Sequence, residues 1–205
     1  MSEPNEKLEE YNNKRDFRST PEPGEAKVNL DWADERPIFV IQKHDASNLH
    51  YDVRIEVDGV LKSWAVPKGP STDPSEKCLA IPTEDHPLAY ANFEGVIPED
   101  AYGGGKVLIW DRGSYRNLKA DEDDPKSVSQ QIEDGHVTIG LSGQKLSGGY
   151  ALIRTGDGDD ARWLLIKMDD EDADARRNPT STEPKSVATG RTLDEIREQE
   201  GESDE

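Results

Sequence analysis

An alternation of apolar and polar residues dominates the middle of this chain and constrains its fold more than any other feature. In residues 49–57, "LHYDVRIEV", the odd-numbered residues from 51 onward are apolar and would face one side of a strand. The dipeptide "DG" at 58–59 then separates this run from "VLKSWAV", a pattern typical of a type I′ hairpin turn. The alternation therefore predicts a β-hairpin with one buried face.

Seven further runs have the same β-strand character, and almost no helical pattern lies between them. They are "PIFVIQ", "CLAIP", "NFEGVI", "KVLIWDRGSY", "HVTIGLS", "GGYALIR" and "RWLLIKM". About nine short strands at this spacing predict a mainly β fold, an antiparallel barrel or sandwich with a few short flanking helices. Closure into a barrel would also hide the edges of the sheet.

The length of 205 residues favours one domain with terminal extensions. We expect residues 1–24 to form an N-terminal helix, over 3–14, and an extended arm that reaches the substrate, because prolines interrupt the helix. Residues 25–170 would form the β-barrel. Residues 171–205 would form an acidic linker and a short C-terminal helix, which begins at a capping box of Thr192 and Glu195.

The net charge of −19 argues against indiscriminate binding to nucleic acid and indicates adaptation to a saline cytoplasm, where salt screens self-repulsion. Residues 36–68 are the exception, with five basic against four acidic side chains, a net of +1. No apolar run is long enough to cross a bilayer, and the N-terminus lacks a signal-peptide pattern. We therefore expect a cytoplasmic protein without membrane contact.

The polar side of the strand over 49–57 gathers His50, Asp52 and Arg54, and His44 lies just upstream. Because residues two apart in a strand point the same way, the imidazole and the carboxylate can reach one ion together. Two imidazoles and a carboxylate suit a divalent transition metal with open positions, and Arg54 suits a phosphate beside it. The alternative is a surface ion pair of His50 and Asp52, but the additional presence of His44, Arg54 and Lys68 favours the metal site.

Other motifs are less specific. "TEDHPLAY" at 83–90 places His86 before a proline, with Glu84 and Tyr90 close by, whereas His136 has no such neighbours. "YGGGKV" at 102–107 lacks the Ser or Thr that follows the lysine of a phosphate-binding loop, so a hairpin turn is favoured. The single cysteine, Cys78, has no obvious base beside it and is predicted to be structural.

The run "FVIQKHDASNLHYDVRIEVDGVLKSWAVPKGPS", followed by "EDHPLAYANFEGVIPEDAYGGGKVLIWDRGSY", "KLSGGYALIR" and "WLLIK", closely resembles the 3′-phosphoesterase domain of bacterial DNA ligase D. The likeness extends to "KRDFRSTPEP" and "SVATGRTLDEI", and so covers nearly the whole chain. Since no ligase or polymerase sequence is attached here, the chain resembles a stand-alone archaeal member of that family.

The resemblance implies a compact antiparallel β-barrel with its active-site groove on the outer surface. It implies an enzyme of non-homologous end joining that trims the 3′ ends of DNA primer–templates and depends on manganese, although other divalent metals are possible. A terminal ribonucleoside would be removed by phosphodiester cleavage, and the remaining 3′-phosphate would then be hydrolysed. A separate DNA ligase, a polymerase or Ku would be candidate partners.

Matching the family's motifs residue by residue implies the roles of individual side chains. The metal ligands would be His44, His50 and Asp52, and the scissile phosphate would be bound by Arg54 and His86. Further functional positions are Gln42, Lys68, Glu84 and Tyr90, and the ribonucleoside step would depend on Arg15, Asp16 and Glu22. One departure is Cys78, because the family usually has an arginine there, and this puts the strength of phosphate binding in question.

Two other functions fit parts of this pattern. His50, Asp52 and a distal His86 match the two-histidine, one-carboxylate triad of non-haem iron oxygenases, but that leaves His44, Arg54 and Lys68 without a role. A non-catalytic module that binds DNA ends is the second alternative. Turnover of a 3′-phosphorylated primer would distinguish such a module from an enzyme.

Overall fold

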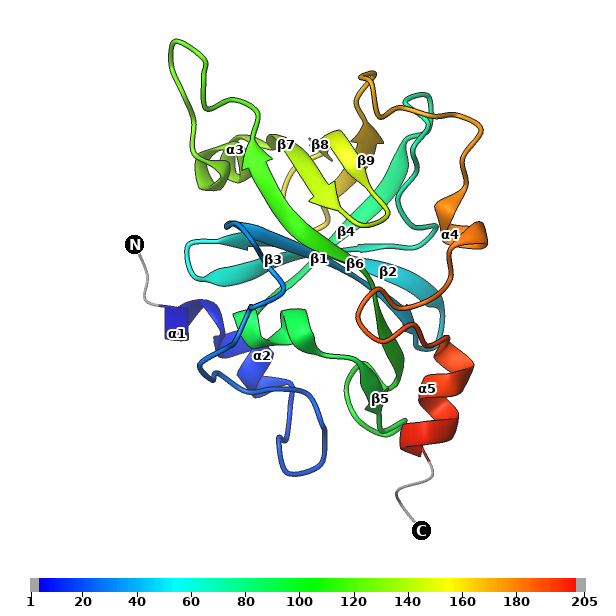
Figure 1. Ribbon diagram of the computed structural model, residues 1–205. Helices are drawn as coiled ribbons and strands as arrows, with labels where there is room; N and C mark the ends of the chain where they lie inside the picture. Colours follow the sequence, from blue (N-terminus) through cyan, green and yellow to red (C-terminus); the bar gives the residue numbers. More distant parts are fainter. Residues whose placement is uncertain (1–3, 202–205) are drawn as a thin grey trace.

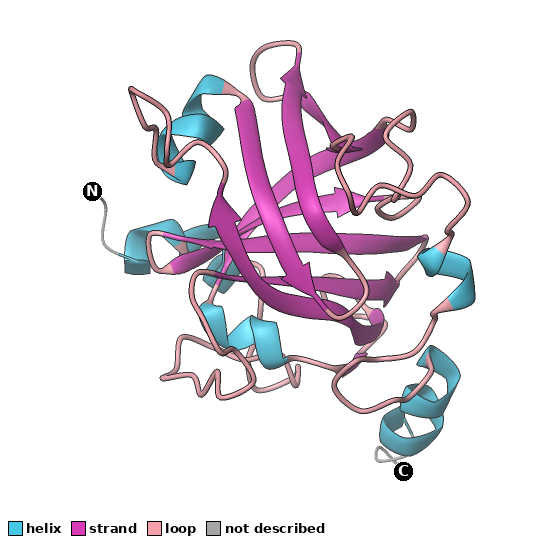
Figure 2. Cartoon of the chain, turned by 45° about the horizontal axis from the view of Figure 1, so that its top comes forward, coloured by secondary structure: helices cyan, strands magenta, loops and turns pink. Residues whose placement is uncertain are grey.

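Nine antiparallel strands form one sheet in the computed structural model, which describes residues 4–201, and eight of the strands close into a barrel (Figures 1 and 2). The order around the barrel is β1-β2-β3-β4-β9-β8-β7-β6, and β6 pairs again with β1 to close it. The strands are β1 (Ile38–Asp45), β2 (Leu49–Val57), β3 (Val60–Val66), β4 (Cys78–His86), β5 (Gly95–Ile97), β6 (Gly105–Asn117), β7 (His136–Gly143), β8 (Ser147–Thr155) and β9 (Arg162–Lys167). The predicted fold class is confirmed, and each predicted strand is present.

The hairpin of β2 and β3 turns at the predicted dipeptide. Asp58 has φ 49° and Gly59 has φ 85°, and positive φ at both central residues defines a type I′ turn. The pairs on either side run without interruption from Val57 with Val60 to Tyr51 with Val66. The turn thus sets the register that sends Tyr51, and every second residue after it, into the barrel.

The barrel interior is filled by the apolar side of each strand. Phe39 and Ile41 of β1 pack there with Val53 and Ile55 of β2, and all four are at most 5% exposed. The rings of Trp64 and Trp163 meet edge to face, with centroids 5.6 Å apart, across this core. Because side chains fill the barrel, the functional pocket has to lie outside it.

A second apolar cluster covers the outer surface of β1. Ile38 and Val40 point outward and pack with Tyr11 of the N-terminal segment and with Tyr90 and Phe93, which lie in and just after the 3₁₀ helix η1 (Leu88–Asn92). Tyr11 is fully buried, and its hydroxyl donates a hydrogen bond to the carbonyl of Pro23 at 2.5 Å. The N-terminal segment, which we expected only to reach for substrate, therefore also completes a core.

The helices agree in part with expectation. The helix predicted over 3–14 is present as α1 (Pro4–Lys7) and α2 (Glu9–Asn13), and residue 3 lies outside the described residues. α5 (Leu193–Glu200) begins at the predicted capping box of Thr192 and Glu195. α3 (Val128–Asp134) was missed, although Ser127 and Gln130 form an equivalent capping box whose spacing is visible in the sequence.

The acidic segment that follows β9 lies against the barrel. The hydroxyl of Thr72 donates to the carbonyls of Asp174 and Arg177, at 2.8 and 3.1 Å. Trp110 Nε1 donates to the carbonyl of Glu183 at 2.9 Å, just beyond α4 (Pro179–Thr182). These contacts use backbone carbonyls, so a polar sequence without an apolar pattern still occupies a defined place.

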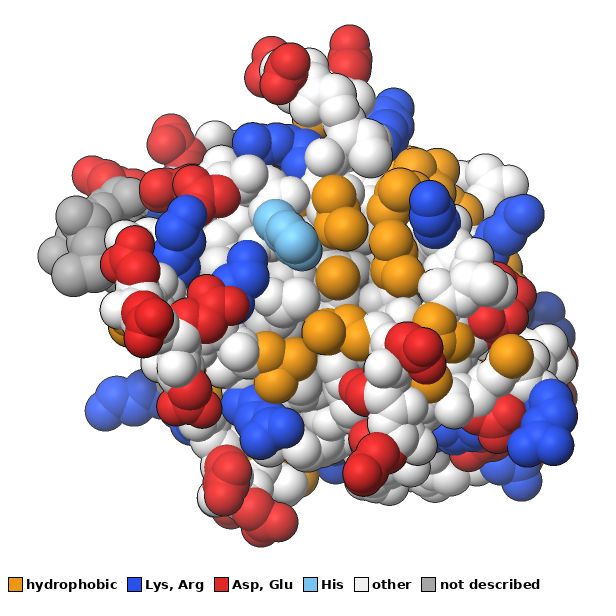
Figure 3. Space-filling view, turned by 90° about the horizontal axis from the view of Figure 1, so that it is seen from above, with side chains coloured by type: hydrophobic (Ala, Val, Ile, Leu, Met, Phe, Trp, Pro, Cys, Tyr) orange, Lys and Arg blue, Asp and Glu red, His pale blue; other side chains and the backbone are white. Residues whose placement is uncertain are grey.

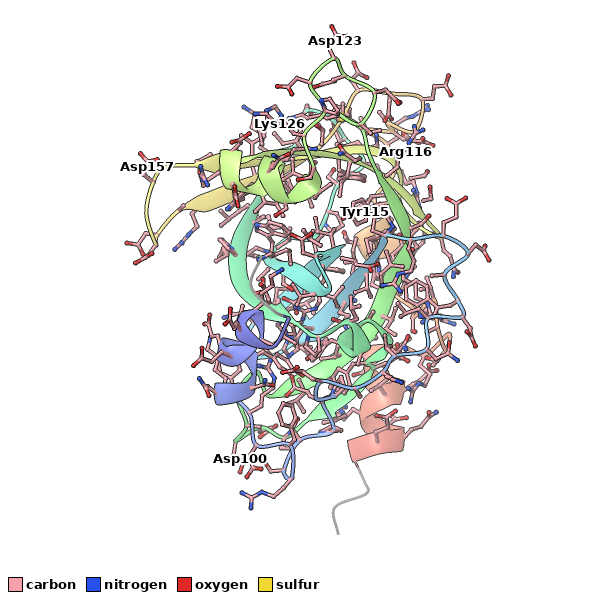
Figure 4. All side chains as sticks on the ribbon, turned by 90° about the vertical axis from the view of Figure 1, so that its left-hand side faces the viewer. Asp100, Tyr115, Arg116, Asp123, Lys126 and Asp157 are labelled. Carbon is pink, nitrogen blue, oxygen red and sulfur yellow. The ribbon has the colours of Figure 1, made fainter. Side chains whose placement is uncertain are left out.

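Acidic side chains gather in the loops. Asp123 and Asp157 project from loops at one end of the molecule and Asp100 from the other end, whereas Tyr115 points toward the barrel (Figure 4). Viewed from above, hydrophobic side chains form a patch among charged ones (Figure 3). Of the helices in residues 4–201, none combines the length and apolar character needed to span a membrane.

Concentrated salt should stabilise this protein, because 44 acidic side chains face 25 basic ones and much of the excess projects from loops. The Debye length falls from about 10 Å at 0.1 M salt to about 3 Å at 1 M, so repulsion between loops is screened. We expect a higher melting temperature in 2 M than in 0.1 M potassium chloride. The triple variant D157N/D159N/D160N should show a smaller gain, and a wild type most stable in dilute buffer would contradict the salt adaptation.

Candidate metal centre and phosphate pocket

The pairing of β1 with β2 brings the predicted metal ligands together on the outer surface of the barrel. His44 pairs with His50, Gln42 pairs with Asp52, and Val40 pairs with Arg54. Cross-strand partners have Cβ atoms about 4.5–5.5 Å apart and share one face of the sheet. The outward side of this strand pair is therefore continuous from the two imidazoles to the guanidinium.

The donor atoms of His44, His50 and Asp52 converge closely enough to hold one ion. One ligand atom from each lies within 4.8 Å of the others. The carboxylate Oδ2 of Asp52 is 3.5 Å from Nδ1 of His44 and 3.3 Å from Nε2 of His50. This set of two imidazole nitrogens and a carboxylate oxygen fits a divalent transition metal with open coordination positions.

Backbone carbonyls set the tautomer of both imidazoles. Nε2 of His44 donates to the carbonyl of Gly103 at 2.8 Å, and Nδ1 of His50 donates to the carbonyl of Asn48 at 3.0 Å. Since a carbonyl only accepts, the ring nitrogen that faces Asp52 carries a lone pair for a metal when the ring is neutral, and it donates to Asp52 when the ring is protonated. Hydrogen bonds of this kind orient metal-binding histidines in many proteins.

Gly103 occupies the connection between β5 and β6, which pair as an antiparallel hairpin, as predicted for "YGGGKV". Its φ of 74° favours glycine, so the turn that orients His44 depends on this residue type.

Asp52 is an ionised carboxylate in a nearly closed environment, 5% exposed. Burial alone would raise the pKa of Asp52, but the charge of Arg54 and hydrogen bonds from His44 and His50 hold it well below its usual range. Burial likewise lowers the pKa of His50, and the hydrogen bond and charge of Asp52 outweigh it, so that pKa is raised. The Asp52 carboxylate is therefore stabilised by Arg54, His44 and His50, and the two histidines could bind one metal ion together with it.

Arg54 is held on two sides and leaves one donor without a partner. Its Nε donates to Oε1 of Gln42 at 2.7 Å, and its Nη2 lies 3.4 Å from Oδ2 of Asp52. The guanidinium also lies over the ring of Tyr90, 4.8 Å from its centroid. Nη1 is buried and has no hydrogen-bond partner among the described residues, a costly state unless a ligand supplies an acceptor.

Gln42 links this guanidinium to η1. Fully buried, it donates through Nε2 to the carbonyls of Tyr90 and Phe93, both at 2.9 Å. With Oε1 accepting from Arg54, every polar atom of the side chain is in use. Gln42 is thus a positioning residue, and no bond of its side chain is left for a substrate.

His86 lies on the opposite wall of the pocket as a neutral imidazole. Nδ1 donates to the carbonyl of Glu84 at 2.9 Å, and Nε2 faces Nη2 of Arg15 at 3.5 Å. Burial, followed by the charges of Arg54 and Arg15, holds the pKa of His86 well below its usual range. His86 does not belong to the ligand cluster, so the oxygenase triad that includes it is not formed.

The N-terminal segment supplies one wall of the pocket. Arg15, whose side chain is 4% exposed, donates to Glu22 at 3.0 Å and to Glu84 at 3.2 Å. Glu22 also accepts from the hydroxyl of Tyr90 at 2.8 Å. These bonds join residues far apart in the sequence, so the arm and the barrel build the pocket together.

The pocket has a cavity volume of about 240 Å³. Among its charged lining residues, the two guanidinium groups of Arg15 and Arg54 face the three carboxylates of Glu22, Asp52 and Glu84, a net of −1 with neutral histidines. A bound divalent cation would change this to +1. An ion held by His44, His50 and Asp52 would therefore make the pocket more favourable to a phosphate.

Several predicted residues lie outside this pocket. Lys68 is exposed and lines a second groove. Asp16 is also exposed and pairs with Arg18 at 3.0 Å. Cys78, where the family usually has an arginine, is 9% exposed, packs in the barrel core and borders the second groove but not this pocket. His136, expected to have no role, is exposed at the start of β7, outside the pocket.

Six lining residues were not identified from the sequence, and three of them bear a polar group or shape the turn beside His44: Thr83, Tyr102 and Gly103. The Oγ1 atom of Thr83 is buried without a hydrogen-bond partner in the described residues, like Nη1 of Arg54. A register shift between β3 and β4 lets Thr83 line the pocket together with its neighbour Glu84 and with His86. Regular alternation would have sent two adjacent residues to opposite sides.

Residues 42–154 match the family model described as the DNA ligase D 3′-phosphoesterase domain. The chain belongs to this family. It is 49% identical over 189 residues to the multifunctional non-homologous end joining protein LigD of Pseudomonas aeruginosa, covering 91% of this chain and 22% of that protein. The LigD of Mycobacterium tuberculosis, named as a DNA repair protein, is 47% identical over 163 residues, covering 80% of this chain and 20% of its own length. The chain thus spans about a fifth of these relatives.

Replacing Asp52 with asparagine should abolish tight metal binding, because it removes the only anionic ligand of the cluster. Losing a residue that merely orients a ligand costs roughly 10–100-fold in metal affinity, so we expect a loss of more than about 100-fold. Titration calorimetry with Mn²⁺ measures it, and circular dichroism checks the fold. Asp45→Asn is the matched control, since Asp45 is 40% exposed and pairs with Lys106. Equal manganese affinity in the Asp52→Asn protein would exclude this site.

His86 should remain neutral at pH 6.5, where an ordinary histidine is half protonated. Its pKa is lowered by burial and by two guanidinium groups, so the folded protein resists a proton that the unfolded chain accepts as the pH falls below about 6.5. His86 therefore lowers the free energy of unfolding as the pH falls below about 6.5. Ring ¹⁵N NMR shifts should report the Nδ1–H tautomer at pH 6.5, with exposed His136 as the internal reference. A doubly protonated His86 ring at that pH would contradict the arrangement.

Proposed function

We propose that this protein is a divalent-metal-dependent phosphoesterase that processes the 3′ ends of DNA. It removes a terminal ribonucleoside by phosphodiester cleavage and then hydrolyses the 3′-phosphate left behind. The observation that supports this most directly is the buried, unpartnered Nη1 of Arg54 beside a cluster of three metal-ligand atoms. A phosphate fits both requirements, because it offers one oxygen to an ion and another to a guanidinium.

His44, His50 and Asp52 would hold the ion, with manganese as the expected metal. When bound, such an ion polarises a non-bridging oxygen and offsets charge that develops on the phosphoryl group. Arg54 then stabilises the same charge through Nη1, since its other nitrogens already have Gln42 and Asp52 as neighbours. This donor is fixed before the substrate arrives, and little reorganisation is needed in the reaction.

His86 and Thr83 complete the phosphate site. Nε2 of His86 carries a lone pair, which in the free protein faces Nη2 of Arg15 at 3.5 Å. A protonated His86 would instead donate from Nε2 to a phosphate oxygen bound beside Arg54. Thr83 offers an unpartnered hydroxyl on the same wall.

The N-terminal wall suits the larger of the two substrates. A 3′-phosphate ends at the metal, whereas a terminal ribonucleoside extends beyond it and needs a surface to lie against. Arg15 and Glu22 supply such a surface, held by Glu84 and Tyr90. We propose that this segment contributes more to ribonucleoside removal than to phosphate removal, and that the relatives' role in end joining extends to this chain, with a separate ligase, polymerase or Ku as partner.

A labelled primer–template ending in one ribonucleotide tests the function directly. With manganese, the primer should first lose its terminal ribonucleoside and then its 3′-phosphate. Without a divalent ion, neither product should form. Binding of the primer–template without any turnover, at saturating manganese, would instead identify a non-catalytic module that binds DNA ends.

Arg54→Lys tests whether the guanidinium does more than supply charge. Lysine keeps the charge but lacks the forked donor geometry that Gln42 and Asp52 orient. Loss of one charge-assisted hydrogen bond costs about 1.5–3 kcal/mol, which corresponds to roughly 10–150-fold in kcat/KM. The 3′-phosphatase assay should show this loss with manganese affinity unchanged. Arg112→Lys, outside the pocket, is the control, and an equal loss in both variants would remove the special role of Arg54.

A further inference from the structure

A second groove lies next to the pocket, between residues 67–79 and residues 175–180. It has a volume of about 800 Å³, and its lining includes Pro179 and Thr180 of α4. The loop between β3 and β4 runs beside α4 in Figure 1. Four basic side chains line it, against two acidic ones. The basic residues are Lys68, Lys77, Arg176 and Arg177. A local excess of +2 is unusual in a chain whose net charge is −19.

The positive charges of this groove are largely available to a ligand. Lys68 and Lys77 are exposed, and neither has an ion pair within residues 4–201. The side chain of Arg176 is 95% exposed, and its ion pair with Asp174 is long, at 3.7 Å. Arg177 uses only Nη2, at 2.8 Å from Glu183. One of the two acids, Asp73, is already occupied by the backbone and hydroxyl of Ser75.

The groove begins where the pocket ends. Ala65 lines the pocket, and Pro67 and Lys68 line the groove two and three residues later on the same chain. The chain turns here, with the amide of Gly69 donating to the carbonyl of Val66 at 3.1 Å, so the two sites adjoin at the end of β3.

The far wall of the groove is held in place. Thr72, on the near wall, donates to the carbonyls of Asp174 and Arg177, and the hydroxyl of Tyr51 donates to the carbonyl of Thr180 at 3.4 Å. Tyr51 is the neighbour of His50 and Asp52 on β2. The segment with the two arginines is thus anchored through its backbone to the strand that holds the metal ligands, and its side chains are left for another partner.

We propose that this groove binds the backbone of the DNA strand whose 3′ end lies in the pocket, with Lys77, Arg176 and Arg177 contacting phosphates upstream of that end. The inference rests on the proposed function, since it names the path of that substrate. Contacts to phosphate fix the position of the strand and are independent of base sequence. The basic side chains would also attract DNA electrostatically, which the acidic remainder of the surface does not.

The double variant Arg176→Gln with Arg177→Gln tests the groove by its salt dependence. Each phosphate contact contributes about 0.9 to the slope of log affinity against log salt, or about eightfold over a tenfold change in salt. Fluorescence anisotropy with a labelled 3′-phosphorylated primer–template should show the slope reduced by about two. KM for that substrate should rise, while hydrolysis of a nucleoside 3′-phosphate, which has no upstream phosphates, should stay unchanged.

Two further variants make the result decisive. Lys77→Gln removes a side chain without internal contacts and should reduce the slope by about one. The double variant Arg116→Gln with Arg162→Gln makes the same change of charge at exposed positions outside the groove, and should leave the slope as in wild type. An unchanged slope in the groove variants, or an equal reduction in this control, would overturn the proposal. If wild type cleaved neither substrate, the proposed function would fail, and the anisotropy series would still decide the groove.

Discussion

The buried carboxylate of Asp52 is the interaction on which the site depends. A carboxylate that is 5% exposed is stable only if its neighbours compensate the water it has lost, and here they are Arg54, His44 and His50. All four come from one strand pair, β1 with β2. A slip of β2 by one residue against β1 would turn His50, Asp52 and Arg54 toward the apolar interior and away from His44, so the register that fills the barrel also assembles the candidate metal centre.

The outer apolar cluster explains why the pocket lies where it does. β1 is buried on both faces, because Phe39 and Ile41 point into the barrel and Ile38 and Val40 pack under the N-terminal segment and η1. Gln42 follows on the outward face, and its bonds to η1 and to Arg54 join this cluster to the phosphate site. Beyond Gln42 the N-terminal segment and η1 no longer cover the outward face of β1, and His44, the first candidate metal ligand, follows there.

Local patterns were sufficient to predict the strands and the convergence of the candidate metal ligands, because both depend on alternation within a few residues. Predicting the candidate ligand cluster required only the alternation in residues 49–57 and one neighbouring strand that contains His44. The arm was different. Nothing within the sequence near Arg15 and Glu22 shows that they meet Glu84 and Tyr90, since those contacts span about seventy residues. Thr83 was missed because a register irregularity overrides alternation.

Acidic and basic side chains lie on different parts of the surface, and this distribution affects which ligands can approach the pocket. The acidic excess lies in loops such as those bearing Asp100, Asp123 and Asp157, which project from the barrel (Figure 4). The charged side chains that line the pocket carry a net of −1 without an ion, and a bound divalent cation would make it positive. The adjoining groove is positive whether or not an ion is present. DNA would then be attracted to the groove first and reach the metal centre as a consequence, whereas a free phosphate would depend on the ion alone. Under the proposed function, the order of these potentials would favour DNA ends over small phosphate esters without any contact to a base.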